Sequence, residues 1–205
     1  MKRVVVLDYG SGNLRSAQRA LERVGARVDV TADPDAVRHA DGLVVPGVGA
    51  YAACMRGIDA VGAREMITDF LSSGRPLLGI CVGMQVLFDA GEEHGVHTAG
   101  LGVLTGEVSA LKAPILPHMG WNVVSAPRTS RLFAGLDRDT RFYFVHSYAV
   151  HSASLAQDAG VVTTAEHGEQ FVAAIESGQV SATQFHPEKS GDAGAVLLRN
   201  WLDLL

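Results

Sequence analysis

The sequence has 205 residues, enough for one domain, or at most one and a half, with a sizeable buried core. Apolar residues make up 47% and charged residues 19%, and the net charge of -5 gives no electrostatic case for binding nucleic acid. No stretch of about 18 consecutive residues is apolar, so neither a membrane-spanning helix nor a membrane partner is expected. Two cysteines cannot form a disulfide framework, and nothing indicates secretion, so we expect a cytoplasmic protein.

The first half of the chain alternates strand-like and helix-like segments. Strands are predicted at residues 2–7, 27–31, 42–45 and 76–80, the first dominated by β-branched residues. Helices are predicted from Asn13 as a cap to about residue 24, from Pro34, in a stretch ending near Ser72, and from Cys81 through Met84, Leu87 and Phe88. Such alternation indicates βαβ units and a parallel sheet that is covered on both faces.

The second half has shorter strands joined by turn-like segments. Short strand-like runs lie within residues 101–124, and longer strands are predicted at 141–150, 160–165, 171–176 and 180–185. These strands indicate hairpins, so the sheet is predicted to be mixed, and residues 193–204 form a closing helix. Because no repeat or linker interrupts the chain, residues 1–205 are predicted to form a single three-layer α/β domain.

The central chemical motif is G-I-C-V-G-M-Q at residues 79–85, where a buried strand gives way to a helix. A nucleophile on such a sharp turn needs small residues two positions before and after it, and Gly79 and Gly83 occupy those positions. The start of the helix favours a thiolate at Cys81, and the Val82 N–H is a candidate oxyanion donor. The alternative for Cys81 is an ordinary buried core cysteine. Cys54 has no such setting, and we interpret it as a core or surface residue.

A base for this nucleophile is predicted at His186. The segment His186-Pro187-Glu188 follows the strand at 180–185, and Cys81 also lies at the end of a strand. Sites in open α/β sheets gather at the carboxyl ends of the strands, so the two side chains can meet. Glu188 can then hold the imidazole by its other nitrogen. Without the turn at Cys81, a strand-ending histidine beside a surface glutamate would be the simpler interpretation.

Other signals give no cofactor or metal. Gly10-Ser11-Gly12 begins like a dinucleotide-binding fingerprint, but Arg15 stands where the third glycine is needed, so a turn is predicted. No P-loop is present, so ATP chemistry is not implied. His94 and His97 have a spacing that suits a metal, but the surrounding segment is rich in glycine, and we interpret them as solvated loop histidines.

The two catalytic segments, G-x-C-x-G-x-Q at 79–85 and Q-F-H-P-E at 184–188, resemble the class I, triad-type glutamine amidotransferases. This resemblance implies a flavodoxin-like fold. It extends over nearly the whole chain, to a branch of the family that acts in histidine biosynthesis. The segments that carry it are LDYGSGNLRS at 7–16, VPGVGA at 45–50, PHMGWN at 117–122, FVHSYAV at 144–150 and QFHPEKSG at 184–191.

The resemblance implies roles for matching positions. Cys81 would attack the side-chain amide of L-glutamine, His186 would carry the proton to the leaving ammonia, and Glu188 would orient His186. The oxyanion would be held by the Val82 N–H and by an N–H of the loop Gly47-Val48-Gly49. Two glycines flank Val48, so a peptide unit there can point either its C=O or its N–H at the oxyanion. A partner that sets this choice would switch the enzyme on.

Further positions follow from the resemblance alone. The residues that match glutamine-binding positions are Gly47, Gly49, Gln85, Ser147 and Tyr148. The residues that match segments near a partner surface are Asn13, Trp121, Asn122 and Lys189. For Trp121, simple core packing is an equal alternative. The implied partner is a cyclase subunit with a (β/α)₈ barrel, which forms a heterodimer with this chain and uses its ammonia.

Three other interpretations remain. The chain could be a non-catalytic binding domain, although such a domain would usually have lost one member of the triad. It could be a cysteine hydrolase, in which Gln85 and the segments GWN and HPEKSG would have no clear purpose. It could also resemble the glutaminase subunit of vitamin B6 synthesis, against which LDYGSGNL and PHMGWN argue.

Overall fold

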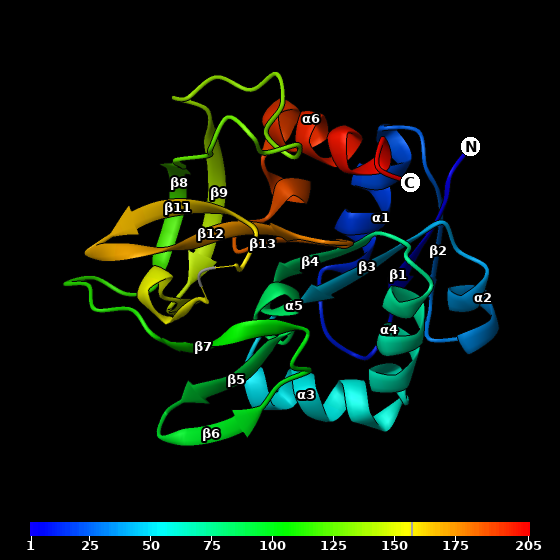
Figure 1. Ribbon diagram of the computed structural model, residues 1–205, viewed down its shortest axis with the longest axis horizontal. Helices are drawn as coiled ribbons and strands as arrows, with labels where there is room; N and C mark the ends of the chain where they lie inside the picture. The colour runs from blue at the N-terminus through cyan, green and yellow to red at the C-terminus, as the bar shows by residue number, and fades with distance from the viewer. Residues whose placement is uncertain (157) are drawn as a thin grey trace.

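A seven-stranded sheet forms the centre of the protein, whose computed structural model describes residues 1–156 and 158–205 (Figure 1). Five of its strands are parallel, in the order β2-β1-β3-β4-β13, and an antiparallel hairpin of β12 and β11 follows. The parallel strands are β1 (Arg3–Leu7), β2 (Arg27–Thr31), β3 (Gly42–Gly47), β4 (Leu77–Cys81) and β13 (Val180–Thr183). The hairpin consists of β11 (Val161–His167) and β12 (Glu169–Ser177). The predicted mixed, mostly parallel sheet is confirmed.

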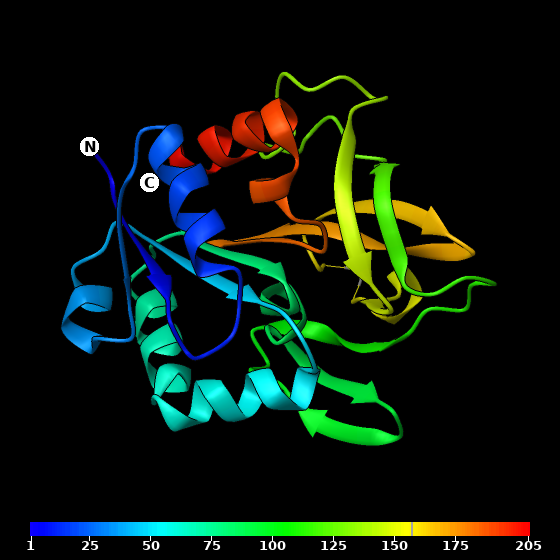
Figure 2. The same cartoon turned by 180° about the vertical axis from the view of Figure 1, so that it is seen from behind.

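Helices cover both faces of this sheet, which gives the predicted three layers. In Figures 1 and 2, α1 (Leu14–Arg23) and α6 (Gly191–Leu202) lie on one face. The other face carries α3 (Tyr51–Ala60) and α4 (Ala63–Ser72), with the short α2 (Pro34–Arg38) beside α4. The side chain of Asp33 accepts a hydrogen bond from the Asp35 N–H and so caps α2, as Asp-Pro predicted.

Two smaller sheets extend the molecule beyond the central one. The first has four strands, in the order β10-β7-β5-β6: β5 (Phe88–Glu93), β6 (Val96–Ala99), β7 (Leu104–Ala110) and β10 (Tyr148–Val150). The second pairs β8 (His118–Val123) with β9 (Arg141–His146) and stands at the same end of the molecule as the β11–β12 hairpin (Figure 2). The strands predicted within 101–124 and 141–150 therefore belong to separate sheets and do not extend the central one.

The helix predicted from Cys81 is much shorter than expected. It is α5 (Val82–Gln85), and Phe88 already belongs to strand β5. Leu87 and Phe88 are fully buried, and the Leu87 carbonyl accepts hydrogen bonds from backbone N–H groups at 103 and 104. Apolar residues at helical spacing are thus buried by sheet pairing here, because the spacing specifies burial and leaves the backbone conformation open.

Three more local predictions need correction. The helical stretch ending at Ser72 is two helices, separated at Gly62, whose φ of 67° is left-handed. The segment around His94 is the β5–β6 hairpin with a turn at His94-Gly95, both with positive φ, so the expected loop is wrong. Asn13 stands at the N-cap position of α1, but its side chain makes no capping hydrogen bond.

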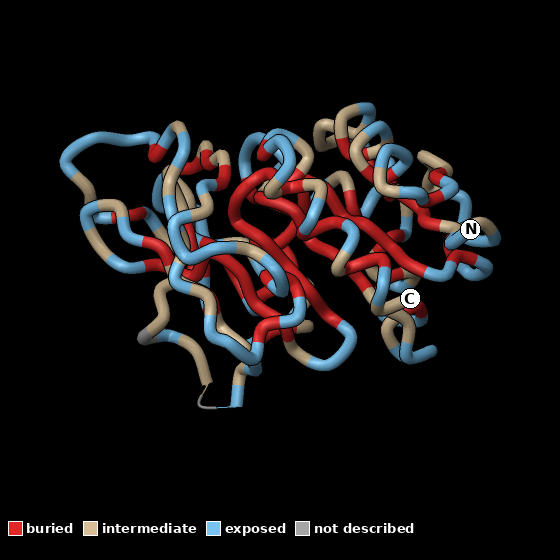
Figure 3. The backbone as a smooth tube through the Cα atoms, turned by 90° about the horizontal axis from the view of Figure 1, so that it is seen from above, coloured by how far each residue is buried: buried red, intermediate tan, exposed pale blue. Residues whose placement is uncertain are grey.

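The buried residues follow the central strands (Figure 3). Residues Val4 to Leu7 of β1 have no exposed surface, which explains their uninterrupted apolar run. Strand β3 beside it and strand β4 beyond β3 are buried along their whole length. Within the described residues, no helix is both long and apolar enough to cross a membrane.

Candidate active site

Cys81 is the last residue of β4 and has an unusual backbone conformation. Its φ is 57° and its ψ is -117°, values that side-chain-bearing residues rarely adopt. A Cβ on Gly83 would collide with the Val45 carbonyl oxygen, and one on Gly79 would lie 2.9 Å from the Gly83 carbonyl oxygen. The turn therefore requires glycine for the steric reason that the motif indicated. Since α5 has only four residues, its dipole at Cys81 is smaller than a full helix would give.

His186 and Glu188 lie next to this turn. Strand β13 is parallel to β4, with Thr183 opposite Ile80, so the residues that follow each strand emerge at the same edge of the sheet. The Nδ1 atom of His186 is 2.7 Å from Oε1 of Glu188. The two side chains are only 2% and 3% exposed. This orientation leaves the buried Nε2 of His186 without a hydrogen-bond partner and free to exchange a proton.

The electrostatic environment of His186 favours its protonated form. Burial alone would lower the pKa of this histidine, but the nearby sulfur of Cys81 and the carboxylate of Glu188 outweigh it and raise the pKa to about 10. A protonated imidazole beside the sulfur stabilises a thiolate, which is the nucleophilic form of cysteine.

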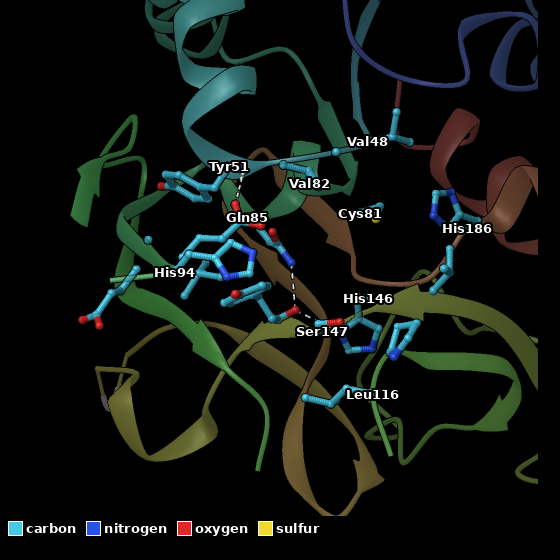
Figure 4. Close-up of a pocket in the computed structure, with 18 residues that line it drawn as sticks. Val48, Tyr51, Cys81, Val82, Gln85, His94, Leu116, His146, Ser147 and His186 are labelled. Atoms are coloured by element: carbon cyan, nitrogen blue, oxygen red, sulfur yellow. Dashed lines mark hydrogen bonds between the residues drawn. The ribbon is translucent and has the colours of Figure 1, made fainter. Parts of the chain in front are cut away.

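A pocket of ≈ 560 Å³ opens beside Cys81 (Figure 4). The sequence-predicted residues that line it are Val48, Gly49, Cys81, Val82, Gln85, Ser147, Tyr148 and His186. His94 is exposed, as predicted for a solvated histidine, and it also lines the pocket, where it packs edge-on against Tyr148. Gly47 does not line the pocket, because it packs beneath α5, where a Cβ would lie 2.8 Å from the Tyr9 hydroxyl.

The peptide groups around Val48 are held by Ser11. The Val48 N–H donates to Oγ of Ser11 at 3.1 Å, and the Ser11 hydroxyl donates to the Val48 carbonyl at 2.7 Å. The thiol of Cys54 lies 3.4 Å from the same carbonyl, which gives this buried cysteine a defined contact. A backbone N–H has a single hydrogen, so the Val48 N–H is occupied by Ser11 and is not available to an oxyanion.

Sequence reasoning missed Gln184, a buried residue beside Cys81 that stands within the motif Q-F-H-P-E. It has no exposed surface, and its Nε2 donates toward Sγ of Cys81 at 3.9 Å. Its Oε1 accepts a hydrogen bond of 2.9 Å from the amide of Gln85. The other amide hydrogen of Gln85 goes to the Tyr148 carbonyl at 2.9 Å, and a dashed line marks this bond in Figure 4. Gln85 thereby joins β10 to the segment that carries His186.

The residues predicted at a partner surface are dispersed. Trp121 is 53% exposed on the outer face of β8, so core packing is the wrong alternative for it. Its ring stands edge-on to the Tyr143 ring, and the Lys189 ammonium lies 5.9 Å from the centre of the Tyr143 ring. Asn122 points to the opposite face of β8, where it contacts His118. Asn13 is separate from this group, at the start of α1.

A nucleophile elbow and a histidine–carboxylate pair at neighbouring strand ends, on a three-layer α/β fold, are the features of a cysteine-dependent acyl-transfer enzyme. The model of the family "Glutamine amidotransferase class-I" matches residues 5–204, and this chain belongs to that family. Its relatives include proteins named imidazole glycerol phosphate synthase subunit HisH. The one from Corynebacterium diphtheriae is 63% identical over 210 residues, which cover both chains completely. The one from Nocardia farcinica is 63% identical over 208 residues, covering 100% of this chain and 99% of the relative.

Solved structures with the same fold are more distant in sequence. A structure described as a glutamine amidotransferase has a TM-score of 0.76 at 20% identity and covers 98% of this chain and 97% of its own. The structure of PurLQS from Thermotoga maritima has a TM-score of 0.75 at 22% identity and covers 99% of each chain. These similarities confirm the predicted fold.

Proposed function

We propose that this chain is the glutaminase subunit of an imidazole glycerol phosphate synthase. It hydrolyses L-glutamine to glutamate and ammonia and passes the ammonia to a cyclase subunit in histidine biosynthesis. The observation that carries the proposal is the buried group of Cys81, His186 and Glu188 at one end of the pocket. The full-length relatives named HisH support the choice of this synthase over the vitamin B6 enzyme.

The first half of the reaction forms a covalent intermediate. Sγ of Cys81 attacks the side-chain carbonyl carbon of glutamine, and its proton resides on Nε2 of His186. The tetrahedral oxyanion is stabilised by the Val82 N–H and by an N–H of the Val48-Gly49 segment. His186 then protonates the amide nitrogen, the C–N bond breaks, and ammonia leaves a glutamyl thioester on Cys81. Glu188 holds the imidazole in place through its Nδ1 atom.

The second half releases glutamate. Water attacks the thioester carbonyl while Nε2 of His186 takes its proton, and the sulfur of Cys81 leaves as a thiolate. The Gln184 amide, which donates toward that sulfur, stabilises the negative charge in both halves of the cycle. The products are glutamate and one molecule of ammonia for each water consumed.

The ammonia acceptor binds on a partner subunit, a cyclase with a (β/α)₈ barrel that forms a heterodimer with this chain. The exposed Trp121 and the neighbouring Lys189 support a contact surface on the outer face of β8 and β9, with Asn13 and Asn122 as further candidates. Both cysteines are free, which fits a reducing compartment such as the cytoplasm.

Glutamate release tests this proposal directly. The isolated chain is assayed first, then the chain with the purified cyclase subunit, and then both subunits with the cyclase's nucleotide substrate. The barrel subunit of the vitamin B6 enzyme serves as the matched control partner. We expect a large rise only with the cyclase and its substrate. Equal rates in all mixtures, or a rise with the control partner alone, would refute the assignment.

A further inference from the structure

Two buried histidines connect the outer two-stranded sheet to the pocket. His118 of β8 and His146 of β9 stand opposite each other in the strand register. Nδ1 of His118 is 2.9 Å from Nε2 of His146, and the two residues are 5% and 7% exposed. Nδ1 of His146 lies 2.9 Å from the carbonyl oxygen of Tyr148, and Nε2 of His118 lies 3.2 Å from the amide nitrogen of Asn122.

The direction of each hydrogen bond in this series, from Asn122 through the two histidines to Tyr148, is determined. The Tyr148 carbonyl can only accept, so Nδ1 of His146 must carry the hydrogen. Burial, opposed by the Tyr148 hydrogen bond and reinforced by His118, lowers the pKa of His146 to about 3, so this ring is neutral and its Nε2 accepts. His118 must then donate from Nδ1. Burial and the neighbouring His167 lower the pKa of His118 to about 4, so its Nε2 accepts from Asn122.

The same series of hydrogen bonds continues into the pocket. The Tyr148 carbonyl accepts from His146 on one side and from Gln85 on the other. Gln85 donates its other amide hydrogen to Oε1 of Gln184, and the Gln184 amide donates toward Sγ of Cys81. An unbroken series of polar contacts therefore runs from Asn122 to the sulfur of Cys81.

We propose that His118 and His146 are positioning residues for the glutamine site. They fix the Tyr148 carbonyl, and through it the amide of Gln85 and the Gln184 amide that donates toward Cys81. This inference rests on the proposed glutaminase function. A carbonyl that has lost one of two donors in a buried setting is free to rotate toward other partners, and Gln85 then loses its fixed orientation. The effect should fall on glutamine binding, because His146 itself lines the pocket and neither histidine hydrogen-bonds to Cys81, His186 or Glu188 in this series of contacts.

The competing interpretation is that the two rings merely fill space. His118 does stack on Phe144 and on His167, with ring centres 4.8 Å and 4.3 Å apart. Packing alone, however, would be satisfied by any ring of similar size and would not select one tautomer. The two interpretations therefore differ in what a phenylalanine at position 146 does to glutamine binding.

The test compares His146→Phe with His146→Asn in the complex with saturating cyclase subunit and nucleotide substrate. Phenylalanine keeps the ring but removes both nitrogens, and we expect KM for glutamine to rise about 10- to 100-fold with a smaller change in kcat. Asparagine places an N–H near the position of Nδ1, so it should recover most of that loss. Phe70→Leu is the packing control, because Phe70 is a buried ring of α4 that does not line the pocket, and it should lower the unfolding temperature while leaving KM unchanged.

A spectroscopic measurement on the parental chain keeps the inference testable even if a variant fails to fold. Nitrogen NMR should show both His118 and His146 as neutral Nδ1–H tautomers that do not titrate between pH 8 and about 5. An Nε2–H tautomer at either ring, or a His146→Phe enzyme with parental KM, would overturn the inference. Failure of the proposed function has a different signature, since the parental complex would then release no glutamate at all.

Discussion

Removing the Ser11 hydroxyl should make the isolated chain a better glutaminase. In the structure this hydroxyl occupies the Val48 N–H and also donates to the Val48 carbonyl. While those bonds persist, the Val48 N–H cannot stabilise the oxyanion, and a missing donor of this kind costs about 2.7–4 kcal/mol, or roughly 10²–10³ in rate. The expected low activity of the isolated chain and its activation by a partner follow from this occupied state.

The size of the change follows from the two hydrogen bonds. Each net hydrogen bond contributes about 0.5–1.5 kcal/mol, and part of the loss in Ser11→Ala is recovered by contacts with Cys54 or water. The active conformation is the one in which the peptide group has rotated so that the Val48 N–H points at the oxyanion. A net shift of about 1 kcal/mol toward this conformation multiplies its small population roughly fivefold. The basal rate should rise by the same factor. The rate of the fully activated complex should change little, since the peptide has already rotated there.

The assay is glutamate release by the isolated Ser11→Ala chain at saturating glutamine, with and without the cyclase subunit and its nucleotide substrate. Ser11→Thr retains the hydroxyl and serves as the matched control with a near-parental basal rate. A basal rate in Ser11→Ala at or below the parental value, with normal folding, would show that Ser11 does not hold the oxyanion segment in its inactive state.

Three further outcomes follow from the site. Cys81→Ala should abolish glutamate release by several orders of magnitude while folding survives, and the synthase should still run on added ammonia; a parental glutaminase rate would refute the mechanism. Glu188→Gln should lower kcat but leave more residual activity than His186→Ala, because His186 keeps its place beside the sulfur. Side-by-side rates of glutamate release decide this. A Glu188→Gln enzyme as inactive as Cys81→Ala would mean that Glu188 does more than orient His186. Gly83→Ala should destabilise the fold, by about 3 kcal/mol or more, because the new methyl group meets the Val45 carbonyl; thermal unfolding measures it, and an unchanged midpoint would show that the turn can relax.

The sequence predicted the central layer well because β1, β3 and β4 are short, largely apolar runs between polar segments. The fully buried run of Val4 to Leu7 illustrates this, since burial on both faces leaves a continuous signal. The end of α5 could not be predicted in the same way. Leu87 and Phe88 satisfy a helical spacing, but Leu87 lies in a turn and Phe88 begins strand β5, which only the pairing of this segment with β7 and its neighbours shows.

The candidate site was predictable where its chemistry is local in sequence. Gly79, Cys81 and Gly83 form one short motif, and His186 and Glu188 form another, so steric and chemical arguments reach them directly. Their catalytic roles remain predictions, whereas the fold and the family are confirmed.

Contacts between distant segments were not predictable. The bond between Ser11 and Val48 joins residues 37 positions apart, and that between His118 and His146 joins residues 28 apart. No periodicity records such pairs, because each residue alone is an ordinary turn or strand residue. His118 and His146 do lie within PHMGWN and FVHSYAV, two of the segments that carry the family resemblance. These segments indicated a region of interest, but they did not indicate that the two histidines contact each other.

The position of β13 in the middle of the sheet determines when this protein can become active during its synthesis. The four strands β1 to β4 emerge first and can pair among themselves, which leaves β4 as an open edge that ends in Cys81. Gln184 follows 103 positions later, and His186 comes just after it. Until that last part of the chain leaves the ribosome and β13 closes the edge, the imidazole of His186 is not beside the Cys81 thiol. On the proposed mechanism, a nascent or truncated chain hydrolyses no glutamine. It does expose an unpaired, apolar strand edge, which can pair with strands of other chains.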